Sequence, residues 1–159
     1  RGAALKCIEL IKNNFKQKFE FYVFISDRNP NLDELIAKTS LYKKLHLHIN
    51  STNVEKYMSN CDLAIITPSV LSYEASTVGL PMLLVTIADN QNINARGWVE
   101  IGAAISLGSV ETLTQEIINN NLNFLINNPE KLNSMSVNCL KHVDGKGAAR
   151  VKEEILSII

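Results

Sequence analysis

The chain has 159 residues, which is enough for one globular domain and too few for two well-packed ones. Hydrophobic residues make up 46% of the chain and charged residues 20%, a balance that supports a buried core and argues against a disordered tail. Sixteen Lys and Arg residues cancel sixteen Asp and Glu residues, so the net charge offers no attraction to a nucleic-acid backbone. No apolar run approaches the roughly 20 residues that cross a bilayer. We therefore expect neither a nucleic-acid nor a membrane partner.

The cysteines indicate the cellular compartment of the protein, and the first residues indicate whether the chain is part of a longer one. Cys7, Cys61 and Cys139 are odd in number, widely spaced and without a CxxC pair. This pattern is typical of reduced cysteines in a cytoplasmic protein and predicts neither a disulfide framework nor a metal site. A helical pattern is already running at Arg1-Gly2-Ala3, so we expect residues 1–159 to be a single domain from a larger protein.

Helical and strand patterns alternate along the chain. The expected helices cover residues 3–15, 31–42, 54–60, about 69–78 and 90–101, with two or three more after residue 110. The expected strands between them cover residues 21–25, 45–49, 63–66, 82–85 and 103–107. Gly79 and Gly102 each follow a helical pattern and are expected to end it.

This alternation predicts the fold class. Strand–helix–strand units with right-handed crossovers build a parallel sheet with helices on both faces. We therefore predict an α/β, Rossmann-like three-layer domain with about five parallel strands. A doubly wound sheet ordinarily begins with a strand, whereas the first element here is a helix, so a strand that precedes Arg1 is expected.

Ligands of such sheets bind beyond the carboxyl ends of the strands. The loops at these ends are 26–31, 50–53, 67–72, 86–90 and the segment after Leu107.

The segment from Thr67 to Glu74 is the first candidate site. A buried strand runs into a polar turn and then a helix, which places free N–H groups and the positive end of a helix dipole at the end of the strand. Ser69 and Ser72 can add hydroxyl donors, and the Glu74 carboxylate can accept hydrogen bonds from two ribose hydroxyls. The alternative is structural: Ser69 is a helix cap and Glu74 complements the dipole of the first turn.

The second candidate follows the next buried strand and contains Asp89, Asn90 and Gln91. Their acceptors and paired amide donors suit a sugar with hydroxyl and acetamido groups. The alternative is that Asp89 or Asn90 caps the following helix.

The histidines and the tryptophan are weaker candidates. His46 and His48 project to one face of a strand, which we interpret as a half-exposed face because no carboxylate or cysteine stands at metal-ligand spacing. His142 near Asp144 is interpreted as a charge at a helix end. Trp98 is interpreted as packing, although its ring can border the second candidate site. None of the usual catalytic or nucleotide-binding signatures occurs.

Five segments carry a family resemblance: Asp62–Ile65, Ser72–Glu74, Gly79–Pro81, Asp89–Gln91 and Val143–Val151. Together they resemble the C-terminal half of the UDP-2,4-diacetamido-2,4,6-trideoxy-β-L-altropyranose hydrolases of pseudaminic acid synthesis. Relatives of those enzymes include spore-coat polysaccharide synthesis proteins. More distantly the chain is similar to the peptidoglycan N-acetylglucosaminyltransferase, which has the two-domain GT-B arrangement.

The resemblance implies that this domain binds the UDP of a sugar nucleotide without a cofactor or metal. An N-terminal domain of the same polypeptide would supply the catalytic His and close over the sugar. The implied reaction is hydrolysis at the anomeric carbon on a cytoplasmic route to a sialic-acid-like nonulosonate, in some bacterial relatives fused to a CMP-sugar synthetase. The 159 residues alone would then be inactive.

The resemblance also assigns roles to individual residues. Glu74 would hold the ribose, and Asn90 with Gln91 would contact the sugar or the attacking water, which makes Asn90 the one candidate catalytic residue in this chain. The diphosphate would face the turn formed by Ser69, Val70, Leu71 and Ser72. The trailing motif with Asp144, Gly145 and Arg150 would be structural.

This chain departs from the family at that turn. The family has a turn of the form Ala-Gly-Ser-Thr, whereas this chain has Pro68-Ser69-Val70-Leu71-Ser72. Pro68 lacks an N–H group, Ser69 adopts positive φ less readily than Gly, and Val70 offers no hydroxyl. Two alternatives therefore stand beside the hydrolase: the C-terminal domain of a glycosyltransferase, and a non-catalytic domain that has lost its ligand.

Overall fold

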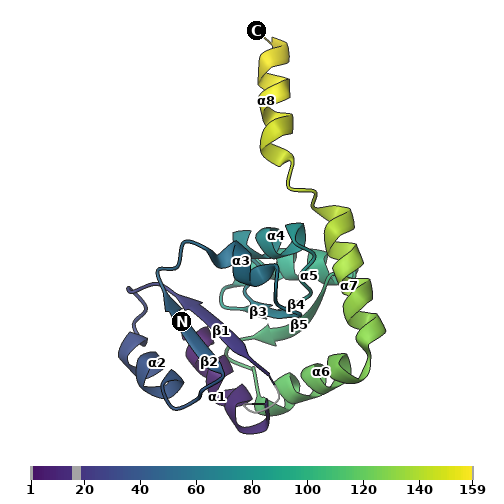
Figure 1. Ribbon diagram of the computed structural model, residues 1–159. Helices are drawn as coiled ribbons and strands as arrows, with labels where there is room; N and C mark the ends of the chain where they lie inside the picture. Colours follow the sequence, from purple (N-terminus) through teal and green to yellow (C-terminus); the bar gives the residue numbers. More distant parts are fainter. Residues whose placement is uncertain (1, 16–18, 159) are drawn as a thin grey trace.

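The computed structural model describes residues 2–15 and 19–158 (Figure 1). Its strands are β1 (Phe21–Ile25), β2 (Leu45–Ile49), β3 (Ala64–Ile66), β4 (Met82–Thr86) and β5 (Ala104–Ser109). Its helices are α1 (Ala3–Phe15), α2 (Leu32–Thr39), α3 (Val54–Met58), α4 (Val70–Thr77), α5 (Asn92–Glu100), α6 (Gln115–Asn127), α7 (Pro129–His142) and α8 (Gly147–Ile158), and the short 3₁₀ helix η1 (Asp89–Gln91) precedes α5. The predicted alternation of strands and helices is confirmed.

All strand pairs are parallel, as predicted, but the described strands form two sheets instead of one. β1 pairs with β2, with Phe21 opposite Leu45 and Ile25 opposite Ile49. β3, β4 and β5 form a second sheet in that order. β1 and β3 are therefore each at an edge of their sheet, and no hydrogen-bonded ladder joins them.

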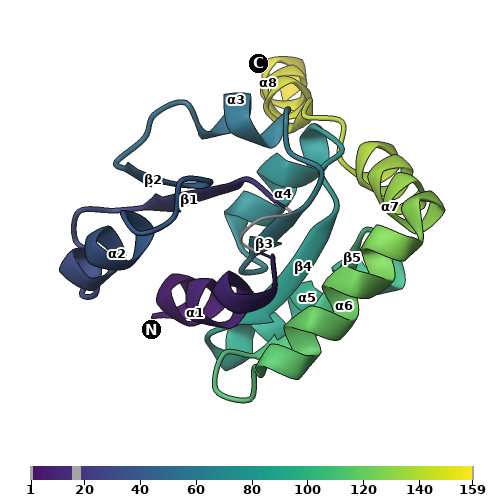
Figure 2. The same cartoon turned by 60° about the horizontal axis from the view of Figure 1, so that its bottom comes forward.

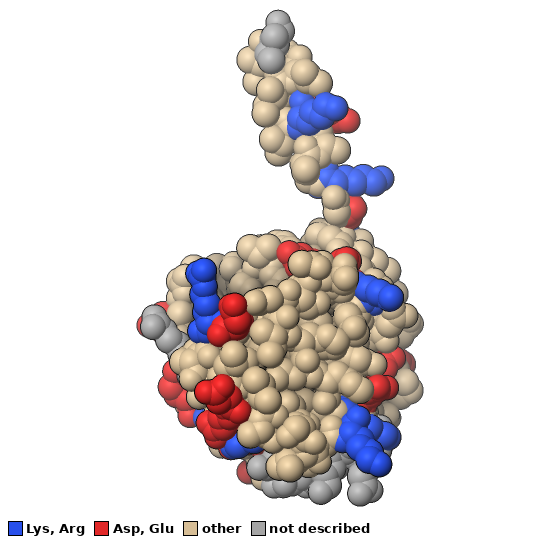
Figure 3. Space-filling model, turned by 60° about the vertical axis from the view of Figure 1, so that its left-hand side comes forward, with Lys and Arg blue, Asp and Glu red and all other residues tan. Residues whose placement is uncertain are grey.

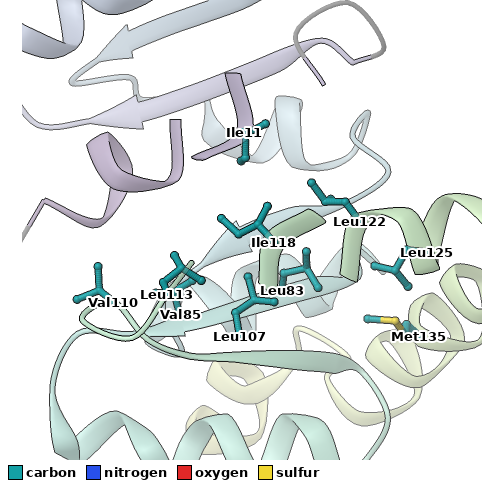
Figure 4. Close-up of a cluster of buried hydrophobic side chains, with 10 residues drawn as sticks. All are labelled: Ile11, Leu83, Val85, Leu107, Val110, Leu113, Ile118, Leu122, Leu125 and Met135. Carbon is teal, nitrogen blue, oxygen red and sulfur yellow. The ribbon is translucent and has the colours of Figure 1, made fainter. Parts of the chain in front are cut away.

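The core lies on both faces of β4, whose five residues are all buried. Leu83 and Val85 point into one apolar cluster with residues of α1, α6 and α7 (Figure 4). Met82 and Leu84 point into the other cluster, with residues of α3, α4, α5 and α7. A strand that is apolar throughout is thus explained by helices packed on both of its faces, which is the predicted three-layer arrangement.

The helices divide between the two faces. α1 packs beside α6 on one face, which the turned view shows clearly (Figure 2). α4 and α5 cover the other face, and α7 packs against both α4 and α6. The layers therefore leave the ends of the strands uncovered, which is where the loops between strands and helices lie.

Some boundaries differ from those predicted. The helix expected over 31–42 ends at Thr39, because the buried Thr39 and the turn through Ser40 redirect the chain toward β2. The helix expected from Asn90 begins as the 3₁₀ helix η1 and becomes α-helical only at Asn92. Gly79 and Gly102 follow α4 and α5 with φ of 72° and 73°, as expected of helix terminators.

α8 stands away from the rest of the molecule (Figure 1). Every described residue of α8 is exposed. At its start Asp144 accepts hydrogen bonds from Arg150 at 2.7 and 3.1 Å and from the Lys146 N–H at 3.0 Å. This pairing holds the pKa of Asp144 down at about 2. The trailing motif thus organises the first turn of α8, in agreement with its predicted structural role.

Candidate functional site

The two predicted loops lie at one edge of the three-stranded sheet. β3 and β4 are parallel neighbours, with Ala64 opposite Met82 and Ile66 opposite Leu84. The loop after β3 and the loop after β4 therefore leave the sheet side by side. This is the edge at which open α/β sheets bind their ligands.

The corner between β3 and α4 is built mainly from backbone hydrogen bonds. The Ser69 N–H donates to the Thr67 carbonyl at 2.8 Å, and the Ser72 N–H donates to the Ser69 carbonyl at 3.0 Å. Ser69 has extended backbone angles at the N-cap position, and its side chain makes no capping hydrogen bond. The amides of Val70 and Leu71 belong to the first turn of α4, whose N–H groups have no partner within a helix. The corner can thus present these two amides to an anion.

Ser72 differs from the expectation that its hydroxyl faces a phosphate. Its side chain is fully buried, and its hydroxyl donates to the Ser69 carbonyl at 2.6 Å. The hydroxyl of Ser69 lies 3.4 Å from that of Thr67 and remains half-buried at the open side. Ser72 therefore supports the corner from inside, because it lies on the same face of α4 as the buried Ala75 and Ser76.

Glu74 lies on the exposed side of α4. Val70, one turn earlier on the same face, is 72% exposed, and Glu74 is exposed as well. The carboxylate is thus available to a ligand beside the first turn.

Tyr73 is half-exposed and meets Trp98 edge-on, with ring centroids 5.0 Å apart. Trp98 is buried, so its predicted packing role is confirmed, and the ring pair fixes α4 against α5.

The loop after β4 holds its polar residues in the short helix η1. The Gln91 side-chain oxygen accepts a hydrogen bond from the Ile87 N–H at 2.9 Å, which braces the loop. The amide group of Gln91 and the exposed side chain of Asn90 are left to face outward. Neither Asp89 nor Asn90 makes a side-chain capping bond to α5, because the cap position of that helix falls on Gln91.

Charged groups contribute little at this edge. Lys6 of α1 reaches it but donates to the carbonyl oxygens of Val110 and Glu111, at 2.5 and 3.2 Å. Charges of both signs are scattered over the margin of the face in Figure 3, and neither sign dominates it. An anionic ligand would therefore be held by backbone amides and the helix dipole, with little help from cations.

A cavity of about 960 Å³ lies between the two sheets and was not predicted from the sequence. Its walls are mostly apolar side chains of β1, β3, α1 and α6. At the carboxyl edge it is bordered by Ser26, Asn50, Ser51 and Thr67, each just beyond the end of a strand.

The histidines pack against and hydrogen-bond to neighbouring residues, which agrees with the structural roles expected of them. His46 pairs with Glu20 at 2.8 Å and stacks on Tyr22, and His48 stacks on Phe24. His142 contacts the Asn138 carbonyl at 2.9 Å. Within the part of the chain that the structure describes, no group of three His, Cys, Asp or Glu residues is placed to hold a metal ion. Over the same residues, no helix is both long and apolar enough to cross a membrane.

Comparisons with known proteins show what this chain is similar to. Residues 67–145, which contain both loops, match the family model of the UDP-glucoronosyl and UDP-glucosyl transferases. The chain is 27% identical over 116 residues to the spore coat polysaccharide biosynthesis protein SpsG of Bacillus subtilis (strain 168), covering 73% of this chain and 33% of that protein. The chain thus spans about a third of the length of this relative.

Solved structures agree on the fold. The MurG structure of Acinetobacter baumannii matches with a TM-score of 0.73 at 22% identity, over 98% of this chain and 46% of that one. The glycosyltransferase WaaG, involved in lipopolysaccharide biosynthesis, matches with a TM-score of 0.72 at 18% identity, over 100% of this chain and 44% of that one. A UDP-GlcNAc 2-epimerase from Neisseria meningitidis, bound to UDP-GlcNAc, matches with a TM-score of 0.67 at 22% identity, over 98% of this chain and 40% of that one.

The chain therefore has an α/β fold, with parallel strands and helices on both faces, that matches the GT-B glycosyltransferase domains of MurG and WaaG. The chain is thus similar to UDP-glucoronosyl and UDP-glucosyl transferases over residues 67–145 and to SpsG over 116 residues.

Proposed function

We propose that residues 1–159 form the UDP-sugar-binding domain of a larger enzyme that hydrolyses a UDP-linked acetamido sugar on a route to a nonulosonate, a sialic-acid-like sugar. The observation that carries the proposal is the open corner between β3 and α4, within a segment that matches a UDP-glycosyltransferase model. An N-terminal domain of the same polypeptide would complete the enzyme and supply the catalytic His. The domain alone would be inactive.

The corner can recognise the diphosphate. The amides of Val70 and Leu71 lie in the first turn of α4, and the positive end of the helix dipole adds to their attraction for an anion. The same groups would stabilise the charge that develops on UDP as it leaves. Glu74 on the exposed face of α4 can accept hydrogen bonds from both ribose hydroxyls.

The loop after β4 can address the sugar. Asn90 is exposed, and Gln91 keeps its amide donors after its oxygen has bound the Ile87 N–H. An acetamido group presents one carbonyl acceptor and one N–H donor, which such side chains can pair with. Asn90 would hold either the sugar or the attacking water, and it is the residue of this chain that we place nearest the reaction.

A glycosyltransferase is the second candidate, because the family model and the GT-B likeness fit it equally well. In that case the same domain binds the same nucleotide, and an acceptor hydroxyl replaces water. A third candidate, a domain without a ligand, is favoured by Pro68, which lacks an N–H group, and by Val70, which lacks the hydroxyl that the family has at this turn.

Two measurements on the full-length polypeptide test these candidates. Titration calorimetry with UDP at millimolar concentration should give a binding isotherm, and its absence would favour the domain without a ligand. UDP release from a UDP-linked diacetamido sugar should then proceed in water alone. Release that requires an added sugar acceptor would identify a transferase instead.

A further inference from the structure

A pair of aromatic rings joins the two helices that begin at the candidate site. Tyr73 of α4 meets Trp98 of α5 edge-on, with ring centroids 5.0 Å apart and an angle of 68° between the ring planes. We propose that Tyr73 is a positioning residue, whose ring sets the distance between the corner that begins α4 and the short helix η1. This inference rests on the proposed function, and it concerns how one domain holds both the nucleotide and the sugar.

The proposed nucleotide contacts and the proposed sugar contacts lie on different elements. The amides of Val70 and Leu71 and the carboxylate of Glu74 all belong to α4. Asn90 and Gln91 lie in η1, which leads directly into α5. A ligand that contacts both groups of residues therefore depends on how α4 is placed relative to α5.

At their carboxyl ends both helices are attached to α7. The hydroxyl of Ser76, near the end of α4, donates to the Cys139 carbonyl at 3.0 Å in the core. Just beyond α5, the Gly102 carbonyl accepts a hydrogen bond from the side-chain amide of Asn138 at 3.3 Å. These two bonds fix the ends of the helices that lie farthest from the ligand edge, so they do not by themselves fix the ends that border the site.

The ring pair acts nearer the ligand edge. Tyr73 is the fourth residue of α4, and its ring lies over the first turn because the side chains of a helix lean toward its N-terminus. Trp98 is only 5% exposed and packs in the core with Leu84 and Ala95, so its ring is a firm support. Among the described residues the Tyr73 hydroxyl has no hydrogen-bond partner. The contact between the rings is therefore the interaction that holds the Tyr73 side chain.

Loss of this ring contact would affect a sugar nucleotide more than the nucleotide alone. UDP would contact only groups of α4, and these move together because they share one helix. A UDP-sugar would also reach Asn90 and Gln91, so its affinity depends on the spacing between the two helices. Without the Tyr73 ring, the first turn of α4 can shift toward Trp98. The sugar would then lose its alignment with η1, and hydrogen bonds weaken steeply as their geometry departs from the optimum.

The alternative is that Tyr73 contacts the ligand directly, since its side chain is 49% exposed and its neighbour in the chain is Glu74. The two roles depend on different parts of the side chain. A direct hydrogen bond needs the hydroxyl, whereas positioning needs only the ring. Tyr73→Phe, which removes the hydroxyl and keeps the ring, therefore separates them, and Tyr73→Leu removes both.

Backbone amide NMR signals of the full-length polypeptide, without ligand, test the coupling between the two elements. In Tyr73→Leu the signals of Ile87 and of residues 89–91 should shift, although they belong to another loop, and in Tyr73→Phe they should stay in place. Phe124→Leu is the matched control, because Phe124 is an aromatic residue of similar exposure, 46%, on α6 at the other face of the sheet. If Tyr73→Leu does not fold, Tyr73→Met replaces it. Unmoved signals would overturn the inference, whatever the outcome with UDP.

Calorimetry with UDP and with UDP-GlcNAc, used as a UDP-linked acetamido sugar, tests the consequence for binding. In Tyr73→Leu the affinity for UDP-GlcNAc should fall about 10-fold, the equivalent of about one hydrogen bond, and the affinity for UDP by less than about 2-fold. Tyr73→Phe and Phe124→Leu should bind both as the unaltered protein does. Equal changes for both ligands in Tyr73→Leu, or a loss in Tyr73→Phe, would overturn the inference while the proposed function stands. Failure of the unaltered protein to bind UDP would overturn the proposed function and the inference with it.

Discussion

The hydroxyl of Ser72 donates to the carbonyl oxygen of Ser69 across 2.6 Å, and this bond anchors the corner of the candidate site to the core. Ser72 is fully buried, while Ser69 borders the open side. The serine nearest the predicted ligand is thus held in place by one that the ligand does not reach. The geometry of the corner is therefore set by packing beneath it.

Substitution of Ser72 should lower the stability of the protein, because its side chain is buried and hydrogen-bonded. Ser72→Ala removes one buried hydrogen bond, so we expect the free energy of unfolding to fall by about 1 kcal/mol. Ser134→Ala, at an exposed position of α7, should change it by less than about 0.5 kcal/mol. Urea unfolding measures both values. Equal effects of the two substitutions would show that the Ser72 bond contributes nothing to stability.

Glu74 should contribute directly to nucleotide affinity. Glu74→Gln keeps the shape of the side chain but removes the carboxylate that would accept from two ribose hydroxyls. We expect UDP to bind about 10-fold more weakly, since hydrogen bonds to charged groups contribute about 1.5–3 kcal/mol. Glu130→Gln, at the start of α7, is the control, because α6 carries the chain to the opposite edge before α7 begins. Calorimetry that gives the two variants the same affinity would remove Glu74 from the site.

Gln91 should have two separable roles. Gln91→Glu keeps an oxygen for the Ile87 N–H but loses the amide donors, whereas Gln91→Ala loses both. We expect the Ile87 amide to exchange quickly with solvent only in the alanine variant. Both variants should bind the UDP-sugar more weakly than the unaltered protein does, with UDP itself little affected. A glutamate variant that binds the sugar nucleotide normally would restrict Gln91 to bracing the loop.

The first turn of α8 should depend on pH and on salt. The pairing with Arg150 lowers the pKa of Asp144 to about 2, below the ordinary value of about 3.9. The pair therefore stabilises this turn fully above about pH 5, and the contribution is lost as the pH falls through 4 toward 2. Because both side chains are exposed, salt should weaken it as well.

Asp144→Asn at pH 7 should reproduce the effect of acid on α8. Arg150→Gln should do the same, whereas Lys152→Gln, on the same helix, should have no such effect. Backbone chemical shifts of residues 147–152 report the helicity in each case. A helix that keeps its shifts in Asp144→Asn would show that the ion pair does not order it.

Much of the fold could be predicted because periodicity is local. The strand Phe21–Ile25 and the helix Ala3–Phe15 have the bounds that their apolar patterns predicted. The unbroken apolar run of β4 predicted a strand covered on both faces, and all of its residues are buried. What spacing could not predict was that the five strands form two sheets, because pairing depends on neighbours that are distant in the sequence.

The candidate site was predicted less completely. Its two loops follow neighbouring parallel strands, and the strand pattern was enough to place them at one edge. The direction of individual side chains was not encoded in that pattern. Ser72 looked like a donor to the ligand, but the packing of α4 on the sheet turns it inward. Likewise the oxygen of Gln91 is already used by Ile87, a contact that depends on the exact course of the η1 turn.

The order of the helices and strands, their parallel arrangement and the polar loops that follow β3 and β4 could all be predicted from the amino acids alone. These properties follow from repeat spacing, turn residues and the handedness of crossovers, which act over short stretches of chain. Three features became visible only in the folded chain: the serine that faces inward, the contact of Tyr73 with Trp98 that joins α4 to α5, and the apolar cavity that separates β1 from β3. Those outcomes depend on which surfaces of distant segments pack together, and that depends on the whole chain at once.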